Sequence, residues 1–160
     1  MNASFPGPTV TPLVEYPLAY AVPASRFLCE TWWTCWTSPQ RQHTWRARSD
    51  SVLATGEPLS VILPAIRDSV DLVWTPDPSW AGAVPAWRGI PCQVGRAQVW
   101  LPVQGTALLR PFSLLGLLPR HDPPDWLPYV LLGAQFVQQY RATVTLDCSQ
   151  SPGRHRLVIP

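Results

Sequence analysis

Three kinds of side chain in this chain could do chemistry: four cysteines, ten acidic residues and three histidines. Cys29 and Cys35 are separated by five residues, which is outside the spacing typical of zinc knuckles. His43 follows them, but no second pair of ligands comes after it. We therefore predict free, partly buried thiols and no metal site, with a Cys29–Cys35 disulfide as the alternative.

The acidic residues form no familiar enzyme motif. Asp71 lies in an apolar run, and Asp122 and Asp125 lie in a Pro-rich segment where they are expected to cap turns. His121 precedes Asp122 but has no nucleophile as a partner. The sequence contains no phosphate-binding loop, metal triad or Gly-x-Ser-x-Gly elbow. We expect no cofactor.

Composition narrows the class of protein. The 160 residues are 46% hydrophobic and 14% charged, which is typical of a folded chain, and 20 prolines exclude long helices. A net charge of +2 argues against electrostatic binding of nucleic acid. No apolar run approaches the roughly 20 residues that span a bilayer, and residues 1–10 lack the features of a secretory signal. We expect a cytoplasmic protein without membrane contact.

Residues 1–50 are predicted to form a Pro- and Trp-rich N-terminal extension. Residues 1–27 are nearly uncharged and Pro-rich, which predicts an extended arm lying on its own domain or on a partner. The segment that follows contains four of the nine tryptophans. Its Trp45, Arg46 and Arg48 could stack on nucleic acid bases. The low net charge favours packing instead, with Trp32, Trp33 and Trp36 covering a core.

Residues 51–160 are predicted to form one β domain. Short runs of β-branched and apolar residues alternate with Pro- and Gly-rich turns. Helical spacing of apolar residues is confined to one short segment near the end of the chain. The expected strands are 59–63, 70–74, 97–103, 107–118, 129–132, 142–148 and 156–159, with a hairpin turn at 66–69, a helix at 134–140 and a turn at 150–153.

The segment Leu131-Leu132-Gly133-Ala134-Gln135-Phe136 resembles a signature of the retropepsin-like aspartic proteases. In that family a hydrophobic strand ends at glycine and turns sharply into a helix that begins x-Asp/Asn-Phe. Gly133 fits this corner because a packed strand-to-helix turn tolerates no Cβ, whereas Gln135 stands where the family has Asp or Asn. The resemblance covers residues 55–160. It implies a mainly β fold, a closed barrel or sheet with a short helix after the Leu-Leu-Gly strand.

Members of this family carry Asp-Thr/Ser-Gly at the end of a strand, here matched to 70–74. Two chains pair, and the two carboxyl groups share one proton and activate a water. At this place the sequence reads Trp74-Thr75-Pro76-Asp77-Pro78-Ser79. In one frame Thr75 stands at the position of the catalytic Asp. In the other frame Asp77 does, followed by Pro and Ser in place of Thr and Gly. Both residues are expected near the Leu131–Gly133 strand and near any dimer axis.

Neither frame contains the normal motif, so the resemblance implies a domain that has lost its chemistry. We predict a non-catalytic protein-binding or structural module, because Trp, Tyr and Arg dominate protein interfaces. The alternative is a homodimeric aspartic endopeptidase with an atypical loop that uses Asp77. A nucleic-acid binder is the third and least supported class.

The C-terminal run 156–160 is expected to form an apolar strand with an open edge. Such an edge would pair with a second copy, with another protein or with the chain's own residues 10–22. Family members dimerise through terminal strands, so the resemblance favours a homodimer. The predicted core consists of Val61, Leu63, Leu72, Trp74, Val99, Leu101, Leu131, Leu132, Phe136, Val144 and Leu146.

Overall fold

The structure is a computed structural model that describes residues 14–21, 26–37, 39–80, 84–126, 128–149 and 154–160. Strands dominate it, and two α-helices and one 3₁₀ helix interrupt them. The elements are β1 (Val14–Ala21), β2 (Arg26–Cys29), β3 (Trp32–Trp36), β4 (Thr44–Arg48), β5 (Ser51–Leu53), β6 (Ser60–Val61), α1 (Pro64–Val70), β7 (Thr75–Pro76), η2 (Pro78–Trp80), β8 (Ala86–Trp87), β9 (Ile90–Pro102), β10 (Leu109–Pro119), β11 (Val130–Leu132), α2 (Ala134–Gln139), β12 (Thr143–Thr145) and β13 (His155–Ile159).

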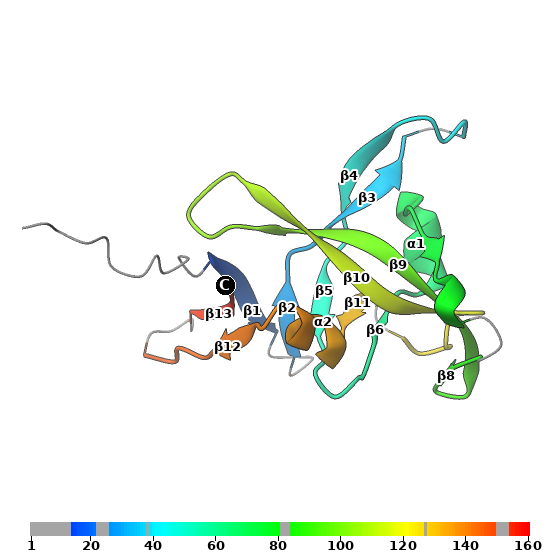
Figure 1. The fold of residues 1–160 in the computed structure, drawn as a ribbon. Helices are drawn as coiled ribbons and strands as arrows, with labels where there is room; N and C mark the ends of the chain where they lie inside the picture. The colour runs from blue at the N-terminus through cyan, green and yellow to red at the C-terminus, as the bar shows by residue number, and fades with distance from the viewer. Residues whose placement is uncertain (1–13, 22–25, 38, 81–83, 127, 150–153) are drawn as a thin grey trace, which may run out of the picture.

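The described strands form one curled sheet (Figure 1). Its strand order is β12-β13-β1-β2-β5-β11-β6-β10-β9-β3-β4, and β7 and β8 pair with β9 beside this path. The two ends, β12 and β4, are not paired with each other, so the sheet is a half-barrel rather than a closed barrel. The mainly β fold is confirmed.

A long hairpin of β9 and β10 crosses the molecule (Figure 1). Buried and exposed residues alternate along most of both strands, because successive side chains of a strand point to opposite faces. The hairpin extends well beyond the expected strand at 97–103, since β9 already begins at Ile90.

The centre of the sheet is the short strand β11. It runs parallel to β5, with Leu132 opposite Leu53, and antiparallel to β6, with Leu131 opposite Val61. All three residues of β11 are buried, as expected of a strand with neighbours on both sides. The predicted buried strand before Gly133 is therefore confirmed.

Most of the predicted core is buried. Trp74 is only partly buried. The prediction that Val144 and Leu146 are buried is wrong, because 37% and 57% of their surfaces are exposed. These two residues belong to the β12 region at one end of the sheet, where only β13 pairs with the chain. The buried members are Val61, Leu63, Leu72, Val99, Leu101, Leu131, Leu132 and Phe136.

The predicted hairpin turn at 66–69 and strand at 70–74 are wrong. Pro64 begins helix α1. The N–H groups of the first turn have no partner within a helix, so the missing N–H of proline costs nothing there, and the φ of proline suits a helix. The helix ends at Asp71, which adopts the left-handed conformation at φ 50° and donates its N–H to the carbonyl of Arg67. Leu72 then makes only an isolated bridge to Cys35.

The N-terminal segment contributes strands to the sheet instead of lying on it. In β1, Tyr16 and Leu18 are buried, and the strand pairs with β13 on one side and β2 on the other. The strands on either side of the expected boundary at residue 50, β4 and β5, belong to the same sheet. Residues 1–13 of the expected arm lie outside the described residues.

The expected open edge at the C-terminus is closed. In β13, Ile159 pairs with Val14 of β1, and Val158 pairs with Thr143 of β12. The chain's own N-terminal strand therefore covers this edge, which was the alternative to pairing with a second chain. The expected turn at 150–153 lies outside the described residues.

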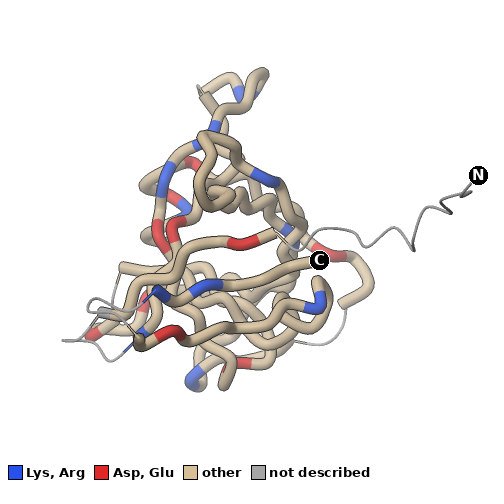
Figure 2. The backbone as a smooth tube through the Cα atoms, turned by 90° about the vertical axis from the view of Figure 1, so that its left-hand side faces the viewer, with Lys and Arg blue, Asp and Glu red and all other residues tan. Residues whose placement is uncertain are grey.

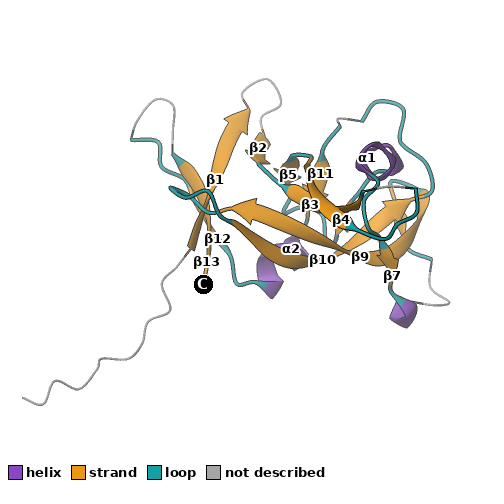
Figure 3. Ribbon diagram, turned by 90° about the horizontal axis from the view of Figure 1, so that it is seen from above, coloured by secondary structure: helices purple, strands orange, loops and turns teal. Residues whose placement is uncertain are grey.

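The two α-helices are short, and they do not form a continuous layer over the sheet (Figure 3). Seen from above in Figure 3, α1 and α2 lie at separate places against the strands. Each buries one large side chain, Ile66 in α1 and Phe136 in α2. In the part of the chain that is described, neither helix has the length and apolar character needed to cross a bilayer.

Candidate functional site

The segment that lies against the end of β11 is Ala54–Pro58. The Ala54 N–H donates to the carbonyl of Leu132 at 2.8 Å, which continues the parallel pairing of β5 and β11 past Leu53. The chain then turns, and the Glu57 N–H donates back to the Ala54 carbonyl at 3.0 Å. The turn thus places Ala54, Thr55 and Gly56 at the carboxyl end of two central strands.

The same turn caps helix α2. The helix begins after Gly133, whose missing side chain leaves the first N–H groups without a cap. The Ala134 N–H instead donates to the Glu57 carbonyl at 2.7 Å, and the Gln135 N–H donates to the Pro58 carbonyl at 3.0 Å. The turn after β5 and the start of α2 therefore form one structural unit.

Gly133 is required at this corner by space and not by its backbone angle, since its φ is −86°. A Cβ at this position would lie 2.5 Å from the carbonyl carbon of Leu59 and 2.8 Å from the carbonyl oxygen of Glu57. Its N–H donates to the hydroxyl of Ser60 at 2.9 Å. The prediction that this corner tolerates no Cβ agrees with the geometry.

The other signature residues support the helix. Phe136 is fully buried and packs edge-on against Phe112 of β10 at a ring separation of 5.9 Å. Gln135 bonds through its amide nitrogen to Gln139 one turn later, at 3.1 Å. Its side-chain oxygen is buried without a hydrogen-bond donor among the described residues.

A cavity of about 320 Å³ opens beside Ala54, and we call it the Ala54 cavity. Its walls come from distant parts of the chain: strand β2, the segment from β5 into the following turn, the tip of the β8–β9 hairpin, the loop before β11, and β11 itself. Apolar and charged side chains share these walls. The lining residues are Arg26, Val52, Leu53, Ala54, Gly56, Glu57, Arg88, Trp126 and Leu131.

Thr75 and Asp77 lie elsewhere, which corrects their expected position beside the Leu131–Gly133 strand. Thr75 pairs with Arg96 of β9, and the Asp77 N–H donates to the carbonyl of Val94 at 3.0 Å. Their expected position depended on a strand at 70–74, and that segment contains the end of α1 instead. The two residues are therefore attached to the long hairpin and not to β11.

The Asp77 carboxylate is already engaged. It accepts hydrogen bonds from the hydroxyl and the N–H of Ser79, at 2.7 and 3.0 Å, and lies 3.6 Å from Arg96. These hydrogen bonds, and then the positive charge of Arg96, lower the pKa of Asp77. This arrangement is typical of an aspartate that starts a helical turn, here η2.

Three of the four cysteines are buried. Cys29, Cys35 and Cys92 are buried free thiols, whereas Cys148 is exposed. Burial raises the pKa of Cys29 to about 12 and that of Cys35 to about 11. No group of three potential metal ligands occurs in the ranges that the structure describes. Asp122, expected to cap a turn, accepts the Ala65 N–H at the start of α1, at 3.2 Å.

Side chains of the Trp- and Arg-rich hairpin of β3 and β4 contact other parts of the chain. Trp33 is fully buried, which confirms packing for this residue, whereas Trp45 is 55% exposed. Arg46 lies over the ring of Trp100 at 4.6 Å, and Arg48 forms ion pairs with Glu30 and Asp50. Figure 2 shows basic and acidic positions interspersed along the backbone. In this hairpin the charge of Arg48 is thus neutralised by carboxylates, whereas Arg46 has an aromatic partner.

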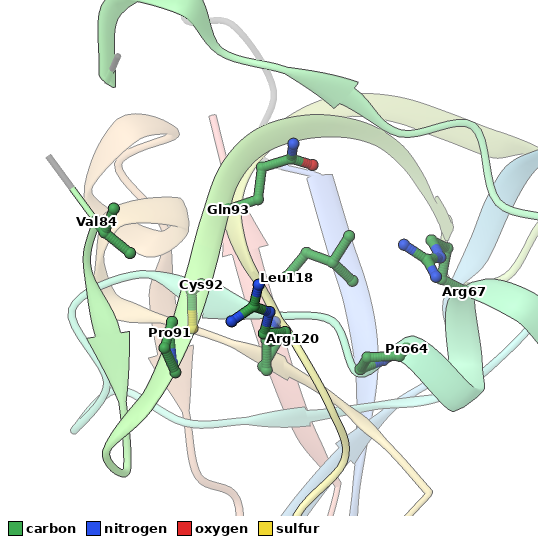
Figure 4. Close-up of a pocket in the computed structure, with 9 residues that line it drawn as sticks. Pro64, Arg67, Val84, Pro91, Cys92, Gln93, Leu118 and Arg120 are labelled. Atoms are coloured by element: carbon green, nitrogen blue, oxygen red, sulfur yellow. The ribbon is translucent and has the colours of Figure 1, made fainter. Parts of the chain in front are cut away.

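A larger cavity of about 600 Å³ lies on another part of the surface. Figure 4 shows that its walls come from α1, with Pro64 and Arg67, from β9, with Cys92 and Gln93, and from the end of β10, with Leu118. Leu118 contributes an apolar side chain to this wall, and Arg67 is engaged with Asp68 at 2.9 Å. None of its lining residues belongs to the β5–β11 corner.

Sequence reasoning missed the segment Ala54-Thr55-Gly56. The available signal was Thr-Gly directly after the short apolar run Val52–Leu53. The Asp-Thr/Ser-Gly motif is recognised by its aspartate, and the segment Ala54-Thr55-Gly56 has no acidic residue. Only the pairing of β5 with β11 brings it to the signature residues.

No protein-family model and no curated protein matches the sequence. Among solved structures, the chain is similar to a retropepsin-like aspartic protease from Rickettsia conorii. The likeness extends over 96% of this chain and 97% of that one, with a TM-score of 0.53 and 10% sequence identity. At this identity the likeness concerns the fold, and the fold of this chain is retropepsin-like.

Proposed function

We propose that this chain is a non-catalytic, retropepsin-like domain that binds a segment of another protein in the Ala54 cavity. The observation that carries the proposal is the tripeptide Ala54-Thr55-Gly56 at the end of β5, parallel to β11. The family's Asp-Thr/Ser-Gly motif ends a strand, and here Thr and Gly follow a strand beside the Leu-Leu-Gly signature. In this frame Ala54 takes the position of the catalytic Asp.

An alanine at this position removes the chemistry of the family. Each chain of a catalytic dimer contributes one carboxyl group, and the pair shares a proton so that one acts as base toward water and the other as acid. The methyl group of alanine has no titratable proton and cannot accept one. A homodimer of this chain would therefore have no carboxyl group at either Ala54.

Binding does not need the missing acid. The Ala54 cavity retains apolar walls in Leu53 and Leu131 and an aromatic wall in Trp126. Such residues, together with arginine, contribute most of the free energy of protein interfaces. Free thiols are typical of a reducing compartment, so a cytoplasmic location is part of the proposal.

The alternative, an endopeptidase that uses Asp77, has weaker support. A shared-proton pair requires one carboxyl group whose pKa is raised by its neighbour. In the single chain the hydrogen bonds from Ser79 lower the pKa of Asp77 instead. Asp77 is also attached to β9 and not to the β5–β11 corner.

Incubation with a denatured protein at mildly acidic pH tests the loss of catalysis. The wild-type protein and the D77N variant are expected to cleave nothing, because neither has a titrating dyad. Cleavage by the wild-type protein that a statine-type inhibitor blocks and D77N abolishes would establish the alternative. The A54D variant tests the frame: inhibitor-sensitive cleavage that appears only in A54D would assign the family's Asp position to residue 54.

A further inference from the structure

We propose that the Ala54 cavity selects protein segments that carry a carboxylate side chain, which Arg26 and Arg88 bind. This inference rests on the proposed function, because it names the class of segment that the same cavity takes. Its basis is the state of the two arginines: both lie over the same indole ring, and neither forms an ion pair with the described residues.

A single indole brings the two arginines together. The guanidinium carbon of Arg88 lies 4.2 Å from the ring centroid of Trp126, and that of Arg26 lies 5.5 Å from the same centroid. Arg88 also lies 5.1 Å from the ring of Trp87, which packs edge-on against Trp126. Stacking on an aromatic face orients a guanidinium while leaving its N–H groups free to donate.

Neither arginine has an anionic partner in the described part of the chain. Arg48, Arg96 and Arg156 each lie within 4 Å of a carboxylate, but no ion pair involves Arg26 or Arg88. Glu57 lines the same cavity, and its side chain forms no ion pair with either guanidinium among these residues. Two positive charges that line one cavity without a carboxylate partner favour the binding of an anion there.

The cavity wall also contains a donor without an acceptor. The indole nitrogens of Trp126 and Trp87 are buried, and neither has a hydrogen-bond acceptor within the described ranges. A buried donor left unpaired costs free energy, so such groups call for an explanation. Protein atoms cover both nitrogens, so the guanidinium groups of Arg26 and Arg88 are the donors that this wall offers to a bound segment.

The remaining walls indicate which anion fits. Val52, Leu53 and Leu131 are apolar and suit aliphatic neighbours, and a volume of about 320 Å³ matches a few side chains rather than a large ligand. Arginine binds carboxylates through paired N–H donors, and these bonds are stronger than neutral ones. A glutamate or aspartate flanked by aliphatic residues combines both requirements.

Titration calorimetry with two matched peptides tests the selection. Both are acetylated and amidated heptapeptides with a central residue flanked by valines, glutamate in one and glutamine in the other. The full-length protein is expected to bind the glutamate peptide roughly tenfold more tightly, as charge-assisted hydrogen bonds predict. The R26Q and R88Q variants keep most of the side-chain length, and each should reduce this preference to within about twofold.

The control is R120Q, which removes an exposed arginine from the larger cavity and should leave the preference unchanged. Thermal unfolding of each variant establishes that it is folded. If both peptides bind equally and R88Q changes nothing, carboxylate selection at this cavity is wrong, while the binding of protein segments by this chain stands. If neither peptide binds to the wild-type protein at millimolar concentration, the proposed binding function fails as well.

Discussion

At the scale of single residues, the tightest constraint in the candidate site is steric. Gly133 has an ordinary negative φ, so another residue could adopt its backbone conformation. The backbone of Leu59 and Glu57 nevertheless occupies the space that a side chain would need. Gly56 lies in the same corner, yet a Cβ there would have nothing within 4 Å.

The contrast between Gly133 and Gly56 can be tested with a matched pair of variants. The Gly133→Ala variant should lose about 1–3 kcal/mol of unfolding free energy, because backbone atoms must shift to accept the methyl group. The Gly56→Ala variant should stay within about 0.5 kcal/mol of the wild type. Urea unfolding followed by circular dichroism measures both. Equal stability of the two variants would contradict the corner geometry described above.

The thiols provide a second prediction at this scale. Burial raises the pKa of Cys29 to about 12 and that of Cys35 to about 11, so both are protonated at any pH well below these values. A disulfide reagent at about pH 8 attacks thiolates that it can reach. We expect one fast-reacting thiol per folded chain, the exposed Cys148, and three more after unfolding. The C148S variant should show no fast phase, and a fast phase in C148S would contradict the burial of the other three.

At the scale of elements, Tyr140 adds hydrogen bonds to the aromatic contacts between helix α2 and the long hairpin. The hydroxyl of Tyr140, just after α2, accepts the Ser113 N–H of β10 at 2.8 Å and donates to the Ser113 carbonyl at 2.9 Å. Its ring also packs against Phe112 and Phe136. The aromatic contacts and the two hydrogen bonds together hold the signature helix against the sheet.

The Tyr140→Phe variant removes the two hydrogen bonds and keeps the ring. It should lower the unfolding free energy by about 0.5–1.5 kcal/mol, since the bonds lie at the surface where water can replace part of them. The control is Tyr20→Phe, because Tyr20 is 46% exposed and its hydroxyl makes no hydrogen bond with the described residues. Chemical denaturation of both variants is the measurement. An unchanged Tyr140→Phe would mean that the ring alone attaches the helix.

At the scale of the whole molecule, the first and last described strands pair with each other. Strand β13 lies between β1 and β12, so the first and last described strands stabilise each other. Leu157 in β13 is fully buried, whereas Leu146, near the outer strand β12, is 57% exposed. The C-terminal strand is thus part of the core.

Replacement of Leu157 by alanine tests this role. The loss of a buried leucine side chain should cost about 2–5 kcal/mol of unfolding free energy. The same change at Leu146 should cost less than about 0.5 kcal/mol, because the side chain is mostly in water already. Thermal and urea unfolding measure both variants. A small effect at Leu157 would show that β13 is not anchored between its two neighbours.

The homodimer implied by the family stays a prediction. In the family, terminal strands form the dimer, but here β1 and β12 already pair with both sides of β13. A dimer of this chain would have to use another edge, and β12 has one open edge among the described strands. Sedimentation at micromolar concentration measures the solution mass, and a monomer would mean that the Ala54 cavity acts within one chain.

Local patterns were sufficient to predict several elements near the C-terminus. The apolar run before Gly133, the helical spacing of Phe136 and Tyr140 and the alternation in the long hairpin are properties of neighbouring residues. They depend on which residues face a core and on the missing Cβ, so they can be recognised without knowing any distant partner. The mainly β class followed from them and from the prolines.

Pairing between distant segments decided the rest. Pro64 can end a strand or begin a helix, and contacts of Ile66 with the core favour the helix. Val144 and Leu146 alternate like buried residues, but β12 has a neighbour on one side only. Ala54-Thr55-Gly56 carries no side chain that signals chemistry, and it becomes a candidate site because β5 pairs with β11, a strand far along the chain. Burial and neighbourhood are properties of the assembled sheet, which is why the position of the site required the tertiary structure.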